Sequence, residues 1–172
     1  MRTTLLLTAV GPDKTGLVES LAKRIAGAGG NWEESRLARL AGQFAGIVLV
    51  TIDSENADKL VASLRDLEPT GLQVTARSVA IPAAASTGQR VRLTVTGGDR
   101  PGIVRDVSRI LAERGVNVEE LDSSMGSAPM SGEAMFVARA RLLVPAALDL
   151  ATLRVSLESL GNELMVDLAP EP

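Results

Sequence analysis

The 172-residue chain contains neither cysteine nor histidine. Without cysteine it can form no disulfide, no thiol nucleophile and no zinc site built on thiolates. Without histidine it lacks the commonest general base and the commonest metal ligand. We therefore expect no catalytic residues, no metal site and no cofactor, and we expect that the protein is not an enzyme.

Aromatic residues and positive charge are also scarce. The chain has two Phe, one Trp and no Tyr, so stacking on nucleobases is nearly excluded. Its net charge of -3 and isoelectric point of about 5.1 argue against direct nucleic-acid binding, which usually requires a basic surface. Apolar runs such as TLLLTAV are far too short to span a membrane, and the N-terminus lacks the features of a signal peptide. These absences predict a cytoplasmic protein whose direct partners include neither membrane nor nucleic acid.

What the sequence does contain is an internal repeat. Residues 13–34 read DKTGLVESLAKRIAGAGGNWEE, and residues 99–120 read DRPGIVRDVSRILAERGVNVEE, so that the two segments align without a gap. Their offset of 86 positions is half the length of the chain, which predicts two copies of one module. Proline, serine and glycine in residues 82–89 are typical of a linker, so we expect one domain at 1–81 and a second at 90–172.

Both copies show the same order of strand and helix patterns. Residues 91–96 alternate between apolar and polar, as in a half-buried strand, whereas the fuller apolar run 3–10 predicts a strand with two covered faces or a central position. Two helices per copy follow from apolar residues spaced three and four apart. The remaining strands are expected at 31–40, 44–52 and 72–81 in copy one, and at 117–125, 133–144 and 163–169 in copy two.

The order β-α-β-β-α-β, present twice, predicts an α+β protein with two tandem ferredoxin-like domains, each an antiparallel sheet with its helices on one face. The other sheet face must be wet or covered, and exposed faces and edges favour a homodimer. We expect Gly29 and Gly115 to end the first helices in a left-handed conformation. Ser54 and Asp149 are expected to cap the second helices.

The segments GPDKTG, residues 11–16, and GGDRPG, residues 97–102, precede the first helix of each copy. Asp-Lys-Thr-Gly alone is typical of the phosphorylated loop of cation-pumping ATPases, but copy two carries Arg100 and Pro101 in place of Lys-Thr. A Walker-type phosphate loop requires Lys directly after its second glycine, where this chain has Leu17. Both copies instead fit an anion site, in which free N–H groups at the helix start bind a carboxylate or the backbone of an α-amino acid.

Polar residues near these loops have two interpretations each. Asp13 and Asp99 either bind the ammonium group of a ligand or cap the helices, with Pro101 in the first helical turn. Asn31 and Asn117 open the second strands, which we expect to start next to the first loops. Their amides serve either turn chemistry or a ligand.

Two further features have a structural interpretation. Glu33 and Glu34, like Glu119 and Glu120, are neighbours on an expected strand and should point to opposite faces, so they cannot form a catalytic carboxylate pair. Trp32 is expected to pack against the linker or a subunit interface, with a ligand shelf as the alternative.

The duplication, the loops and the block N-x-E-x-S-R-L-A-x-L-x-x-x-F, present from Asn31 to Phe44, resemble tandem ACT-domain proteins, and most of all the glycine cleavage system transcriptional repressor family. The resemblance implies a small regulatory protein that binds an amino acid, such as glycine or serine, at an interface between ACT modules. It also implies action through a DNA-binding regulator protein in the transcriptional control of amino-acid metabolism. The ligand-binding positions that it implies are Gly11, Pro12, Asp13, Lys14, Thr15, Gly16, Leu17, Asn31, Gly98, Asp99, Arg100, Pro101, Gly102, Ile103 and Asn117.

Two other functions compete with this interpretation. In the first, the chain is a protein–protein interaction module without a ligand, and its ACT domains mediate assembly only. In the second, it is an enzyme, since formyltetrahydrofolate deformylases also begin with an ACT-like segment. Those enzymes need a large catalytic domain, which these 172 residues do not contain.

Overall fold

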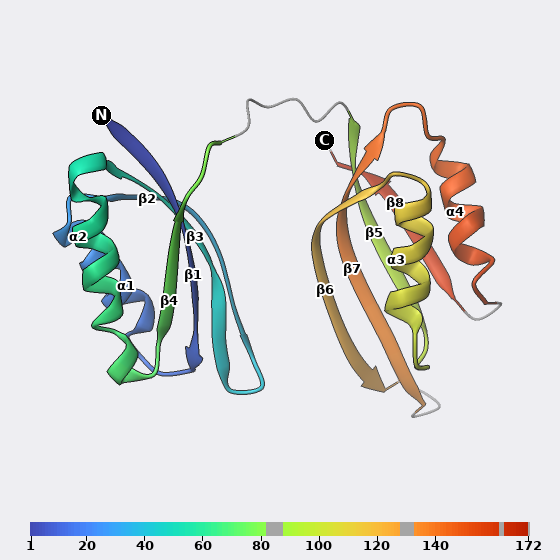
Figure 1. Ribbon diagram of the computed structural model, residues 1–172. Helices are drawn as coiled ribbons and strands as arrows, with labels where there is room; N and C mark the ends of the chain where they lie inside the picture. Colours follow the sequence, from blue (N-terminus) through green and yellow to red (C-terminus); the bar gives the residue numbers. More distant parts are fainter. Residues whose placement is uncertain (82–87, 128–132, 162–163, 172) are drawn as a thin grey trace. The chain divides into compact units, whose positions relative to one another are not determined.

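A computed structural model describes residues 1–81, 88–127, 133–161 and 164–171. The chain divides into two compact units, Met1–Ala83 and Ala84–Pro172, which we call unit 1 and unit 2 (Figure 1). Of the predicted linker, residues 82–87 lie outside the described residues, and Gly88 and Gln89 begin the first strand of unit 2. The domain boundaries at 81 and 90 therefore remain a prediction.

Unit 1 is a four-stranded antiparallel sheet with two helices on one face (Figure 1). The strand order is β2-β3-β1-β4, so β1 is a central strand, as its long apolar run predicts. Along the chain the elements are β1 (Arg2–Pro12), α1 (Leu17–Gly27), β2 (Asn31–Leu40), β3 (Gln43–Asp53), α2 (Ser54–Arg65), the 3-10 helix η1 (Glu68–Thr70) and β4 (Gln73–Ser78).

Unit 2 repeats this arrangement with the strand order β6-β7-β5-β8. Its elements are β5 (Gly88–Gly98), α3 (Ile103–Glu113), β6 (Asn117–Ser127), β7 (Ala134–Pro145), α4 (Leu150–Glu158) and β8 (Met165–Pro170). The predicted α+β fold, with two β-α-β-β-α-β modules in tandem, is confirmed. Between the strands predicted at 117–125 and 133–144, Gly126 and Ser127 belong to β6, and residues 128–132 lie outside the described residues.

Each unit has its own hydrophobic core between the sheet and the helices. In α1, Leu17, Leu21 and Ile25 recur every four residues and are at most 8% exposed. This spacing keeps them on one face of a helix with 3.6 residues per turn. Trp32 belongs to the same core, because it is partly buried and packs against the buried residues of unit 1. The predictions for Trp32 missed this contact.

The helix ends confirm three of the caps predicted at Gly29, Gly115, Ser54 and Asp149. Gly29 and Gly115 follow α1 and α3 with positive φ angles of 77° and 68°. The Asp149 side chain accepts a hydrogen bond of 2.9 Å from the Thr152 N–H at the start of α4. The prediction for Ser54 is wrong, because β3 runs into α2 without a loop and Ser54 is already the first helical residue.

The paired glutamates also differ from expectation. A β-bulge lies between Trp32 and Glu34 in β2. The same irregularity occurs at the corresponding place in β6. A bulge adds one residue to the strand and breaks the alternation of faces. Glu119 and Glu120 therefore both reach Arg141, at 3.7 Å and 3.1 Å, and the prediction that such neighbours point to opposite faces is wrong.

Within the described parts of the chain, no helix combines the length and apolar character needed to cross a bilayer.

Candidate functional site

The first loop, which joins β1 to α1, follows two residues that end the strand, Gly11 and Pro12. A Cβ atom at Gly11 would lie 3.0 Å from the Leu72 Cα and closer still to the Gly71 carbonyl oxygen, so the backbone of unit 1 leaves no room for a side chain there. At the other end of the loop, Gly16 is the N-cap of α1 with a φ of 90°. Glycine fits both positions for these steric reasons.

Asp13 holds the loop against the turn between β2 and β3. Its backbone N–H donates to the Gly42 carbonyl at 2.9 Å, and its carboxylate accepts from the Arg39 Nε at 2.7 Å. No side chain caps α1. The prediction that Asp13 caps this helix is therefore wrong, because the chain makes a turn through Lys14 and Thr15 before the helix begins.

Lys14 holds the other side of the loop. Its Nζ donates to the Thr70 carbonyl at 3.0 Å, in the segment between α2 and β4. Thr15 is exposed in the turn before α1. Leu17 is only 8% exposed and packs in the core, so it offers a ligand its backbone N–H rather than its side chain.

The second loop, Gly98–Gly102, has the same backbone frame. The Asp99 N–H donates to the Ala134 carbonyl at 2.9 Å, as Asp13 does to its own turn. Gly102 is the N-cap of α3 with a φ of 91°, and no side chain caps the helix. The predicted cap at Asp99 is wrong for the same reason as at Asp13. Pro101 precedes the N-cap, so its predicted place in the first helical turn is also wrong.

Arg100 takes the part that Lys14 has in unit 1. Its Nη2 reaches the Leu160 carbonyl at 3.4 Å, in the segment that follows α4. Its Nη1 also binds the Asp106 carboxylate at 3.0 Å, and Arg105 binds the same carboxylate at 2.8 Å. These hydrogen bonds, first that from Arg105 and then that from Arg100, lower the pKa of Asp106. Ile103, the first residue of α3, is 3% exposed and again offers only its backbone.

The two loops therefore lie directly before the first turns of α1 and α3. The first N–H groups of any helix have no helical acceptor, and the helix dipole makes this end attractive to anions. The side chains of Asp13, Lys14 and Arg100 bind other segments of their own units. This end of each helix is therefore the part of the loop that is suited electrostatically to an anion.

Asn31 lies far from the first loop within unit 1. It pairs with Thr51 on β3, and Thr51 pairs with Thr4 on β1. Gly11 lies seven residues further along β1, which is about 23 Å at 3.3 Å per residue. The expectation that Asn31 starts next to the loop is wrong, because α1 carries the chain back by about 16 Å towards the beginning of β1.

Asn117 has the equivalent place in unit 2. It pairs with Leu143, which pairs with Arg90 near the start of β5, whereas Gly98 is the last residue of that strand. In unit 1 the Asn31 side chain has a partner, since its Nδ2 donates to the Glu33 carboxylate at 2.8 Å. No single unit brings its loop and its asparagine onto one small ligand.

Some residues that shape the loops carry no local signal in the sequence. Arg39 and Thr70 come from distant parts of unit 1, and only the folded sheet brings them to Asp13 and Lys14. Asp106 lies in α3, and its place in the sequence is that of an ordinary solvent-exposed charge on a helix. Across the described residues, no group of three or more acidic side chains is arranged to hold a metal ion.

Comparison with known proteins identifies the repeated module. The ACT-domain family matches residues 3–76 and again residues 91–137. The glycine cleavage system transcriptional repressor of Escherichia coli is 29% identical over 93% of this chain and 85% of its own length. A UPF0237 protein of Methanopyrus kandleri is 36% identical over 45% of this chain and 81% of its own length.

A solved structure agrees with the whole chain. A Galdieria sulphuraria protein described as unknown has a TM-score of 0.87 and 27% identity, and the match covers 100% of both chains.

Proposed function

The chain belongs to the ACT-domain family, and on that premise we propose that it is a regulatory protein, not an enzyme, that binds an amino acid and thereby modulates a partner. Glycine, serine or a similar small amino acid is the ligand. The control of transcription in amino-acid metabolism is the process, since the E. coli relative is named a glycine cleavage system transcriptional repressor. One observation carries the proposal: both units build the same loop in front of a helix that no side chain caps, and the first N–H groups of a helix have no helical acceptor.

An amino acid offers two charged groups to such a site. Its carboxylate fits the N–H groups that follow Gly16, where the helix dipole is positive. Its ammonium group fits the Asp13 carboxylate, whose side chain remains 33% exposed beside Arg39. Asp99 has the corresponding place in unit 2.

The amide that completes the site comes from a different module. Asn31 and the loop of unit 1 are about 23 Å apart along the sheet, so one ligand cannot touch both within one unit. An interface between modules, in which the loop of one meets the asparagine of another, resolves this separation. Binding at such an interface favours the assembled state, which is how the ligand acts on a partner.

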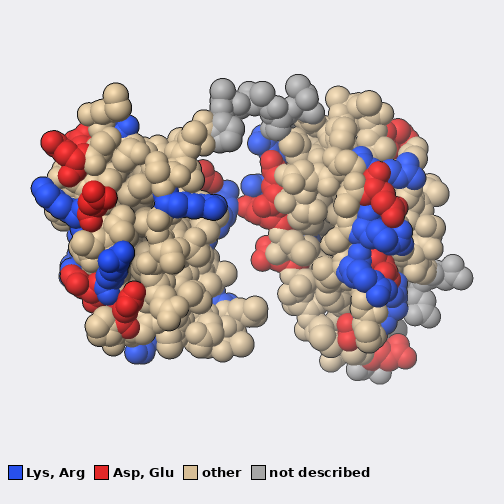
Figure 2. Space-filling model, in the orientation of Figure 1, with Lys and Arg blue, Asp and Glu red and all other residues tan. Residues whose placement is uncertain are grey.

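The partner, rather than this chain, contacts nucleic acid. On the face shown in Figure 2, basic and acidic side chains are interspersed over both units. Ion pairs account for part of this pattern, such as Arg105 with Asp106 at 2.8 Å and Arg109 with Glu113 at 3.0 Å along α3. With a net charge of -3, the electrostatic term that drives binding to phosphates is weak. A DNA-binding regulator protein is the partner that we propose.

Thermal unfolding of the full chain with each of the twenty amino acids tests the ligand. At ten times its Kd a ligand that binds only the folded state adds about 1.4 kcal/mol, which shifts the Tm of a small domain by several degrees. A shift with glycine or serine supports the proposal. No shift with any amino acid at 10 mM excludes binding with a Kd of about 1 mM or tighter.

Two variants locate the ligand. Asp13→Asn and Asp99→Asn remove the proposed ammonium partner in one unit each, and we expect each to lose the Tm shift at that unit. Asp58→Asn, at an exposed position of α2, is the matched control and should keep the full shift. Equal shifts in all three variants would place the ligand elsewhere.

The alternative, assembly without a ligand, rests on a different surface. The sheet face of unit 1 away from the helices carries apolar side chains, including Leu6, Leu49 and the exposed Val10 and Ile47. In unit 2 the corresponding face carries ion pairs such as Arg141 with Glu120 at 3.1 Å. We propose that the apolar face of unit 1 forms a homodimer, whether or not an amino acid is bound.

A further inference from the structure

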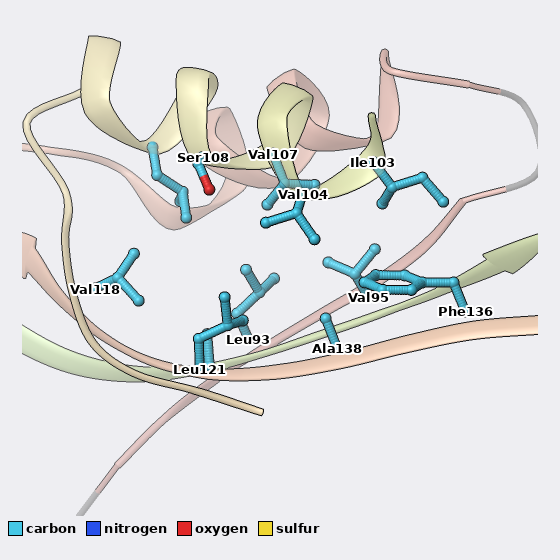
Figure 3. Close-up of a pocket in the computed structure, with 12 residues that line it drawn as sticks. Leu93, Val95, Ile103, Val104, Val107, Ser108, Val118, Leu121, Phe136 and Ala138 are labelled. Atoms are coloured by element: carbon cyan, nitrogen blue, oxygen red, sulfur yellow. The ribbon is translucent and has the colours of Figure 1, made fainter. Parts of the chain in front are cut away.

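Unit 2 contains an apolar cleft that is distinct from the loops. It has a volume of about 250 Å³ and lies between α3 and the strands β5, β6 and β7 (Figure 3). Of the twelve residues that line it, all but one have hydrocarbon side chains, and the exception is Ser108 on α3. The cleft offers no charged group to a ligand.

The cleft is open to solvent at one side, and buried side chains form its floor. Val104 on α3 and Val118 and Leu121 on β6 are 42%, 38% and 48% exposed, so they form the mouth. On the sheet below, Leu93 and Ala140 are only 2% and 6% exposed. Figure 3 shows the helix side chains above and those of the sheet below, with the space between them.

In unit 1 the side chain of Trp32 fills the place that corresponds to the cleft. Trp32 corresponds to Val118, because Trp32 pairs with Val50 and Val118 pairs with Leu142, each directly before the same bulge. The indole ring of Trp32 packs against the core of unit 1. Its replacement by valine in the second copy removes a bicyclic ring from between helix and sheet.

Two neighbouring positions also became smaller. Leu37, which pairs with Gly46, corresponds to Ser123, which pairs with Ala138. Val48 of unit 1 corresponds to Ala140 in the sheet of unit 2. Three positions became larger: Ser35 corresponds to Leu121 at the mouth, and Ala9 and Gly46 correspond to Val95 and Ala138 in the sheet. The space in unit 2 therefore results mainly from the absence of the indole ring and not from a smaller floor.

We infer that this cleft is a binding site for an uncharged aromatic or branched aliphatic group of about the size of an indole ring, carried by a small molecule. A ligand that fills the cleft removes this apolar lining from water and packs against it, so binding gains hydrophobic and dispersion energy. An apolar cavity of about 150 Å³ already binds benzene. A charged ligand is excluded, because the lining could not solvate it.

The shape favours a small molecule over a protein segment. A docking helix binds through a row of anchors three or four residues apart, which need a long groove. The cleft instead has room for one ring, with Ser108 at its edge as a hydrogen-bond partner for a ring N–H or hydroxyl. The inference uses none of the loop N–H groups, so it stands apart from the proposed amino-acid site.

Indole is the probe for this inference. In ¹H–¹⁵N spectra of the full chain titrated with indole, we expect shifts that saturate and that are confined to residues around the cleft in α3, β6 and the facing strands. Val118→Trp restores the side chain of unit 1, and we expect it to weaken indole binding at least tenfold. Val155→Trp, at a position of α4 that is 65% exposed, is the matched control and should bind indole as the unmodified chain does.

Ala140→Val narrows the cleft from its floor, in case Val118→Trp disturbs the fold. It restores the valine that unit 1 has at this place, Val48, and should also weaken indole binding. The inference is overturned if the unmodified chain shows no saturable shifts at millimolar indole, or if both filled variants bind indole with unchanged affinity. It is also overturned if the shifts lie outside unit 2.

Discussion

Replacing Gly11 by alanine tests the packing that shapes the first loop. A methyl group at this position would lie 3.0 Å from the Leu72 Cα and 3.1 Å from the Gly71 carbonyl carbon, with the Gly71 oxygen nearer still. All three are backbone atoms and cannot rotate away. The strand β1 or the segment before β4 must therefore move, and overpacking of this kind costs about 1–3 kcal/mol.

Gly27→Ala is the matched control in the same unit. No atom lies within 4 Å of a methyl group there, and Gly27 is the last residue of α1. Alanine in a helix is favoured over glycine by about 0.5–1 kcal/mol. The two variants should thus differ by about 1.5 to 4 kcal/mol in the free energy of unfolding of unit 1, with Gly11→Ala the less stable.

The single tryptophan makes the measurement specific. Trp32 packs in the core of unit 1, so its fluorescence during urea unfolding follows that unit. We expect a lower urea midpoint for Gly11→Ala, a higher one for Gly27→Ala, and little change of slope in either. If Gly11→Ala unfolds at the midpoint of the unmodified chain or above it, the close approach of the two backbone segments is refuted.

Three further outcomes are expected. Asp149→Ala should lower the stability of unit 2 more than Asp53→Ala lowers that of unit 1 in denaturant unfolding, because only Asp149 caps its helix through the side chain. The unmodified chain should be more stable than Asp106→Asn above about pH 4, because the pKa of Asp106 is lowered in the folded state. This difference in the free energy of unfolding should vanish as the pH falls through that lowered pKa. Denaturant unfolding of both chains at several pH values measures it. Ile47→Asp should shift a homodimer to monomer in sedimentation velocity, whereas the exposed Val155→Asp should leave it unchanged.

Local patterns predicted the fold because each strand and helix carries its own period. The range predicted for β2, 31–40, is the observed one, and the helix α1 buries its residues at the expected spacing. Because the module occurs twice, each strand and helix was predicted from two separate segments of the sequence. Gly29 and Gly115 illustrate this, since both copies end their first helix with the same left-handed glycine.

The site was harder to predict because its geometry depends on long-range register. Asp13 was interpreted as a cap because it precedes a helix, but Lys14 and Thr15 separate it from the N-cap Gly16, and its carboxylate binds Arg39 instead. Asn31 follows the loop and one helix in the sequence, yet the helix returns the chain to the far end of the sheet. Neither fact is visible without knowing which strands pair.

The prediction that neighbouring glutamates point to opposite faces was wrong for a different reason. A bulge is an insertion of one residue into a ladder, and a strand pattern of alternating faces gives no sign of it. In β6 the bulge turns Glu119 and Glu120 towards the same arginine, Arg141. Sequence alone predicted the strand correctly and the direction of its side chains incorrectly.

The two copies kept the backbone frame of the loop and changed the charges around it. In the third helical position, unit 1 has Glu19, which pairs with Lys23 at 2.8 Å, whereas unit 2 has Arg105. A carboxylate placed on the free N–H groups meets a like charge in unit 1. In unit 2 it meets two arginines that already bind Asp106. We therefore expect the proposed amino-acid ligand to bind the two loops with different affinities, and a titration of the full chain should show two classes of site rather than one.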